Sequence, residues 1–160
     1  DRYMIRKIRR VRWFNFMRYG AVRIAIRHDS LLKANLSFSQ LFGGGALYGS
    51  GEDSMFLADA LKKHLKIYSY PEEIAELTNE RKSTWFNGDF RKLLYDKGAW
   101  LAANYPIKKR IFKFYFAEKL YLKAGVSRKK AIRLIEAGIK GYPALRNYDK
   151  FMKKYEDSCL

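Results

Sequence analysis

Residues 42–57 read FGGGALYGSG-EDSMFL, a glycine-rich segment that passes directly into an acidic pair and then into an apolar pattern. Five glycines within residues 43–51 favour a loop, because glycine weakens the interior of a helix or strand. From Asp53 onward the apolar residues recur at helical spacing, at Phe56, Leu57, Ala60, Leu61 and Leu65. We therefore expect a loop that ends in an amphipathic helix, with Glu52 and Asp53 in its first turn.

The segments on either side of this junction predict a mixture of strands and helices. Residues 21–27 alternate β-branched residues with Arg and Ala, which is typical of a half-buried strand. Asp29 or Ser30 is suited to cap a short helix, and residues 65–70 have the composition of a second strand. Residues 89–103 show helical spacing that Pro106 brings to an end.

The C-terminal third is helical in character throughout. We expect one helix over residues 107–123 that ends at Gly125. Ser127 is suited to cap a second helix over residues 128–139, which ends near Gly141. Pro143, as a first-turn residue, predicts a third helix that runs to about Tyr155.

Composition limits the class of protein. The 160 residues carry a net charge of +17, with 48% hydrophobic and 16% aromatic residues, which excludes a disordered basic tail. Cys159 is the only cysteine, so an internal disulfide and a cysteine-rich zinc cluster are excluded and a reducing compartment is favoured. No run of 18 apolar residues occurs, so we expect no transmembrane helix.

The positive charge gathers at the two ends of the chain. Residues 1–27 hold nine basic residues and one acidic residue, residues 28–106 hold nine and ten, and residues 107–160 hold fifteen and five. Such ends suit nucleic acid, anionic lipid or an acidic substrate, although a solvated face would look the same.

The junction itself carries the candidate chemistry. Glu52 follows Gly51 where a phosphate-binding loop would have Lys, and the spacing G-x-G-x-x-G does not occur. A carboxylate in the first turn of a helix is held ionised by the helix dipole, so Asp53 beside a loop is suited to act as a general base, or merely to cap the helix.

His28 and His64 lack metal-ligand spacing, and Trp85 is suited either to stack on a sugar or to fill the edge of a core.

Four segments in a fixed order carry a family resemblance. They read FSQLFGGGA at residues 38–46, GEDSMFL at 51–57, LKKHLKIY at 61–68 and STWF at 83–86. Together they resemble the bacterial family-two glycosyltransferases of capsule and exopolysaccharide clusters. The resemblance covers about residues 21–106 and corresponds to the C-terminal, acceptor-side half of their GT-A domain.

The resemblance implies a role for each matching residue. It implies Asp53 as the catalytic base, supported by Glu52, and it places Gly43, Gly44, Gly45 and Trp85 at the border of acceptor and donor. The segment Ser83-Thr84-Trp85-Phe86 differs from the Gln-x-x-Arg-Trp of processive synthases, which favours an enzyme that adds single sugars.

One element of the family is absent from the sequence. The N-terminal half of the family binds the nucleotide-sugar and supplies an Asp-x-Asp metal motif, and no Asp-x-Asp occurs in this chain. We therefore expect a fragment that is inactive alone. The resemblance implies a divalent metal, Mg or Mn, in the parent enzyme, with its ligands mostly outside this chain and no metal ligand assigned within it.

The fold class expected is therefore α/β: residues 1–106 as the C-terminal part of a GT-A domain, and residues 107–160 as a basic, all-helical extension. The function expected is transfer of a sugar from a nucleotide-sugar to a hydroxyl of a glycan or lipid-linked acceptor, in the cytoplasm at the inner face of the cell membrane. The alternative is a basic module that binds nucleic acid or a membrane surface without catalysis. A glycine loop that ends in two acids, with no known reader motif, disfavours nucleic acid.

The helix expected over residues 107–123 has two distinct faces. We expect the first to pack on the catalytic part; it comprises Ile107, Ile111, Phe114, Tyr115, Tyr121 and Leu122. We expect the second to meet an anionic membrane; it combines Lys108, Lys109, Lys113, Lys119 and Lys123 with Phe112, Phe116 and Leu120. The alternative is that Phe112, Phe116 and Leu120 are buried against residues 128–155.

Overall fold

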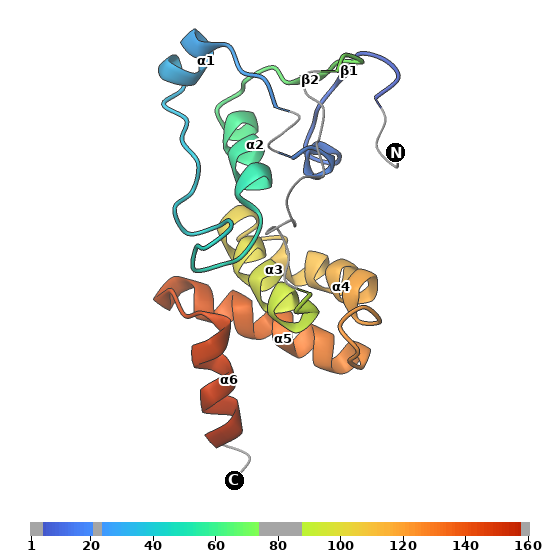
Figure 1. Cartoon of the computed structure of the whole chain (residues 1–160), viewed down its shortest axis with the longest axis vertical. Coiled ribbons are helices and arrows are strands. Elements are labelled where there is room, and N and C mark those ends of the chain that lie inside the picture. The colour runs from blue at the N-terminus through green and yellow to red at the C-terminus, as the bar shows by residue number, and fades with distance from the viewer. Residues whose placement is uncertain (1–4, 21–23, 74–87, 158–160) are drawn as a thin grey trace, which may run out of the picture. The chain divides into compact units, whose positions relative to one another are not determined.

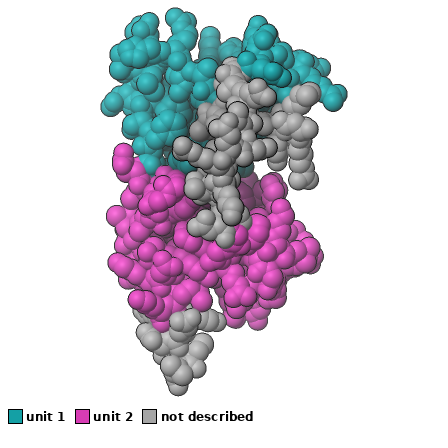
Figure 2. Space-filling model, in the orientation of Figure 1, with its two compact units in different colours: residues 1–39, 52–82 teal, residues 40–51, 83–160 magenta. Residues whose placement is uncertain are grey.

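The computed structural model describes residues 5–20, 24–73 and 88–157, which fall into two compact units. Unit 1 comprises residues 1–39 and 52–82, and unit 2 comprises residues 40–51 and 83–160 (Figure 2). The glycine-rich loop belongs to unit 2 although both of its chain neighbours belong to unit 1. The division expected at residue 106 falls inside unit 2.

Unit 1 combines short strands with two helices. Strand β1 (Arg9–Arg10) pairs antiparallel with β2 (Tyr68–Ser69), with Arg9 opposite Ser69. A 3-10 turn, η1 (Phe16–Arg18), contacts helix α2 (Glu52–Lys62), and helix α1 (His28–Lys33) lies between them in sequence. The helix expected after the glycine loop is therefore confirmed, with Glu52 and Asp53 in its first turn.

The core of unit 1 forms around the apolar face of α2. Phe56 and Ala60 are buried with Leu36, and the Phe38 ring stacks on Phe56 with 4.4 Å between the ring centroids. The Lys63 ammonium donates to the Asn35 carbonyl at 2.8 Å, which ties the end of α2 to the end of α1. Burial of these side chains fixes which face of α2 turns inward.

Two expectations for this unit are wrong. Residues 24–27, the described part of the strand expected over 21–27, form no strand, because alternation alone supplies no partner for a ladder. Helix α1 begins at His28 with Arg27 at its N-cap and no side-chain cap, so Asp29 and Ser30 lie inside it. A third expectation is confirmed in part, because the strand expected over 65–70 is present at Tyr68–Ser69.

Unit 2 is helical. It contains α3 (Phe90–Asn104), α4 (Lys109–Leu120), α5 (Arg128–Gly141), the 3-10 turn η3 (Tyr142–Ala144) and α6 (Tyr148–Asp157) (Figure 1). The Asp89 carboxylate caps α3 by accepting from the Arg91 and Lys92 amides, and Ser127 caps α5 as expected. The described part of the chain is thus mostly helical with one two-stranded sheet. Among its helices, none has the length and apolar character that crossing a bilayer requires.

Helices α3 and α5 cross at two glycines. A Cβ added to Gly98 would overlap the Ile135 carbonyl oxygen, and one added to Gly138 would overlap the Tyr95 carbonyl oxygen. The two backbones therefore touch directly, and the side chains beside the crossing are fully buried. A glycine inside a helix weakens it by about 1 kcal/mol relative to Ala, but a larger residue at either position would force the two helices apart.

The last helix starts later than the sequence indicates. Pro143 lies in η3, and Leu145 adopts a left-handed conformation with φ 48° that ends the turn. Helix α6 then begins at Tyr148, where the Asn147 side chain accepts from the Lys150 amide at 3.1 Å. Asn147 is therefore the capping residue, because its side-chain oxygen reaches a free amide of the first turn.

Helix α4 packs with the face opposite to the one expected. Phe116 and Leu120 are buried, and α4 contacts both α3 and α5. Ile107 and Ile111, expected to pack on the catalytic part, are 89% and 72% exposed. Both faces of this helix are apolar, so helical periodicity could not decide between them.

The crossing predicts that Gly98→Ala destabilises unit 2 by about 2 kcal/mol or more, because the added methyl group forces two backbones apart. Gly44→Ala is the matched control, since a Cβ there meets nothing within 4 Å. Chemical denaturation followed by far-UV circular dichroism measures both. An unchanged midpoint for Gly98→Ala would show that the helices do not touch at this point.

Candidate functional site

The glycine-rich loop has a defined shape. The Gly43 amide donates to the Tyr48 carbonyl at 2.9 Å, and the Tyr48 amide donates to the Leu41 carbonyl at 3.0 Å. Between these bonds the backbone turns with positive φ at Gly43 (129°) and Gly45 (80°), values that other residues adopt only with strain. The glycines therefore close a tight turn.

Tyr48 anchors the loop in the core of unit 2. Its ring is fully buried against Phe42, and its hydroxyl donates to the Arg146 carbonyl at 3.2 Å. The Tyr95 hydroxyl, from α3, donates to the same carbonyl at 3.0 Å. Burial raises the pKa of Tyr48 to about 12 and so favours the protonated phenol that donates this hydrogen bond.

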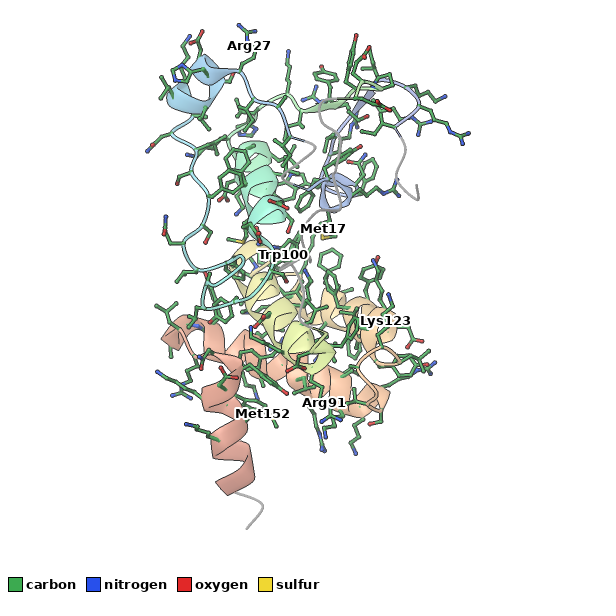
Figure 3. The ribbon with its side chains drawn as sticks, viewed as in Figure 1. Met17, Arg27, Arg91, Trp100, Lys123 and Met152 are labelled. Carbon is green, nitrogen blue, oxygen red and sulfur yellow. The ribbon has the colours of Figure 1, made fainter. Side chains whose placement is uncertain are left out.

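Helix α3 holds the far end of the loop. The Gly49 amide donates to Oδ2 of Asp96 at 2.9 Å, and the Lys92 ammonium donates to the same oxygen at 2.7 Å. Gly51 has φ 114°, and a Cβ there would lie 2.8 Å from the ring of Trp100, which Figure 3 labels on α3. Any other residue at Gly51 would push the loop away from α3.

Asp96 is a residue that the sequence analysis missed, and it holds the loop to α3. It is 3% exposed, and its second oxygen, Oδ1, is buried with no hydrogen-bond partner among the described residues. Burial raises the pKa of the Asp96 carboxyl above its usual range, and the hydrogen bonds from Lys92 and Gly49 offset this only in part. The available signal was the Lys92–Asp96 pair, four residues apart on one helix face.

The carboxylate pair lies in unit 1, at the start of α2. Glu52 and Asp53 are both half-buried in the first turn, where the helix dipole favours negative charge. A Cβ on Gly20 would lie 3.3 Å from Oδ2 of Asp53, so the backbone near η1 passes close to this carboxylate. The close approach of Gly20 to Asp53 is not visible in the sequence, because no local pattern links the two residues.

The remaining predicted site residues differ in their surroundings. Gly43 is buried, whereas Gly44 and Gly45 are exposed and a Cβ on either would meet nothing within 4 Å. Trp85 lies outside the described residues. The three glycines belong to unit 2 and the two carboxylates to unit 1, and the chain joins them directly through the Gly51–Glu52 bond.

The described residues offer no cation site. No three side chains of His, Cys, Asp or Glu come together among them as metal ligands would. The candidate chemistry within the described residues is that of a carboxylate pair, which follows the ordered glycine turn directly in the sequence.

Comparisons with known proteins add no further assignment: no family model matches the chain, and neither the curated proteins nor the solved structures returned a match.

The buried Asp96 predicts a pH effect on stability. Because the folded state holds the Asp96 proton more tightly than the unfolded chain, wild-type stability should fall relative to Asp96→Asn as the pH rises from about 4 to 7. The Asn side chain keeps an oxygen that can accept from Gly49. Urea denaturation across this range measures the difference, and a constant or opposite difference would contradict the burial argument.

Proposed function

We propose that this chain is the acceptor-side part of a glycosyltransferase with a GT-A domain, acting in the synthesis of a surface or extracellular polysaccharide. In this proposal the enzyme transfers one sugar from a nucleotide-sugar to a hydroxyl group of a glycan or lipid-linked acceptor. The four ordered segments at residues 38–46, 51–57, 61–68 and 83–86 supply the family resemblance on which it rests.

One structural observation supports the proposal most. An ordered glycine turn, fixed by Tyr48 and by Asp96, leads without an intervening residue after Gly51 into the first turn of α2, where Glu52 and Asp53 lie. Such a turn lets a bulky ligand approach the backbone, because Gly44 and Gly45 carry no side chain and have open space around them.

The proposed chemistry assigns one proton transfer to Asp53. Its carboxylate takes the proton of the acceptor hydroxyl while the hydroxyl oxygen forms a bond to the anomeric carbon of the donor sugar. The bond from that carbon to the diphosphate oxygen breaks, and the nucleoside diphosphate leaves. In this proposal Glu52 supports Asp53, as the resemblance implies, and the helix dipole favours negative charge in this first turn.

The donor and its metal are assigned to residues outside this chain. The described residues form no cation site for the divalent metal that the resemblance implies. In this proposal the chain contributes the base and the loop, and the nucleotide-sugar is bound by a donor half that completes the GT-A domain.

The proposal predicts that Asp53→Asn lowers transfer by about 10²–10⁴-fold in the protein that carries both halves, because the amide keeps the shape of the side chain but cannot take a proton. A radiolabelled or fluorescent donor assay measures the rate, and circular dichroism checks the fold.

Asp59→Asn is the matched control, because it makes the same chemical change on α2 at a partly exposed residue whose partner is Lys62. It should leave transfer within about twofold, in keeping with a surface substitution. Transfer by Asp53→Asn within threefold of the wild type would remove Asp53 from the reaction.

A further inference from the structure

The outward face of α4 carries an exposed apolar surface that nothing in unit 2 covers among the described residues. We call it the outer face; it consists of Ile107, Ile111, Phe114, Tyr115 and Leu122, all more than half exposed. It lies opposite the buried side chains of Phe116 and Leu120, as expected for a helix with two apolar sides. Exposed large apolar side chains gathered in this way mark an interaction surface.

Positive charge surrounds the outer face. The Lys119 ammonium lies over the Tyr115 ring at 5.8 Å, and the Lys113 ammonium over the Phe114 ring at 4.9 Å. Lys108 and Lys123 are exposed at the two ends, Lys123 in the turn that follows α4 (Figure 3). Cations beside exposed aromatic rings are the composition of helices that lie in the headgroup region of a membrane.

The one acidic residue on this face is neutralised. Glu118 accepts a hydrogen bond from the Arg128 guanidinium at 3.0 Å, and the same guanidinium lies over the Tyr121 ring. In the sequence, Glu118 interrupts the apolar pattern of this face. Because its charge is paired, it opposes an anionic surface less than an isolated carboxylate would.

A basic cleft adjoins the outer face, between α4 and α5. It has a volume of about 490 Å³ and is lined by Lys109, Arg110, Lys113, Glu136, Ile139 and Lys140. Lys113 pairs with Glu136, which leaves Lys109, Arg110 and Lys140 as cations without an ion pair to a described carboxylate. Arg110 lines the cleft, and Phe114 of the outer face follows it by about one turn of α4. The cleft and the outer face therefore share an edge. A phosphate group with an apolar tail beside it matches this arrangement.

We propose that the outer face of α4 docks on an anionic phospholipid bilayer, with the apolar side chains in the headgroup–acyl boundary and the α4–α5 cleft against lipid phosphates. An anionic bilayer is complementary in charge to this part of the chain, because residues 107–160 hold fifteen basic residues against five acidic ones. A second copy of the chain would bring the same positive charge to the contact. A nucleic acid would gain nothing from exposed Ile107, Ile111 and Leu122.

The face proposed to dock on the membrane is not the one expected from the sequence. Docking by this face does not require that the chain be a glycosyltransferase. The sequence placed Phe116 and Leu120 toward the membrane, and these side chains are buried. The docking face is the one that had been expected to pack on the catalytic part.

Vesicle co-sedimentation of the 160-residue chain tests the proposal. Vesicles of phosphatidylcholine with phosphatidylglycerol should bind the wild type at least tenfold more strongly than vesicles of phosphatidylcholine alone, and high salt should release it. Ile107→Ser with Ile111→Ser should weaken binding at least tenfold, because two apolar side chains no longer enter the bilayer. Both side chains are exposed, so the fold should be kept, which circular dichroism checks.

Two double charge reversals test whether binding depends on this particular face or only on the net charge of the chain. Arg110→Glu with Lys119→Glu should weaken binding at least about twentyfold, since each cation at an anionic surface contributes about fivefold. Lys129→Glu with Arg133→Glu makes the same change of charge on exposed residues of α5 outside the cleft and should stay within about threefold.

Three results would overturn the proposal. They are equal binding to neutral and anionic vesicles, equal losses for the two pairs of charge reversals, and unchanged binding after the two isoleucine substitutions. Self-association of the wild type in sedimentation equilibrium, abolished by the isoleucine substitutions, would instead assign the outer face to a second copy.

Discussion

The direct backbone contact between α3 and α5, at Gly98 and Gly138, is the constraint on which the rest of unit 2 depends. It fixes the position of α3, and α3 presents Asp96 and Trp100 to the glycine-rich loop. Helix α5 runs directly into η3. The Arg146 carbonyl, shortly after η3, accepts hydrogen bonds from both Tyr48 and Tyr95. The loop is thus held at both ends by groups whose positions follow from one helix crossing.

Helix α4 shows how one amphipathic element can serve two surroundings. Its inner face contributes Phe116 and Leu120 to the core of unit 2, and its outer face presents Ile111 and Phe114 among cations. Burying the inner face supplies the packing free energy, so the outer face is left available for a partner. The pairing of Glu118 with Arg128 makes that outer face more uniform in charge than the sequence indicates.

Features that depend on a few neighbouring residues could be predicted from the sequence. The cap at Ser127 and the start of α2 after Gly51 depend on a few neighbouring residues and were confirmed. The close approach at Gly98 and the burial of Asp96 depend on residues about forty positions away, which no local pattern reveals. The strand expected at residues 24–27 failed for a related reason, because a strand requires a partner. The candidate glycines belong to unit 2 and Glu52 and Asp53 to unit 1, an assignment that the four ordered motifs do not show.

The central claim is that the glycine-rich loop is built into unit 2 by α3. Native-state amide hydrogen exchange tests it most directly, because the Tyr48 and Gly49 amides donate to Leu41 and to Asp96. The account predicts that these two amides open with a free energy close to that of the α3 amides at Leu94 and Ala99. Exchange at Tyr48 and Gly49 as fast as in an unstructured peptide, with the α3 amides still protected, would contradict it.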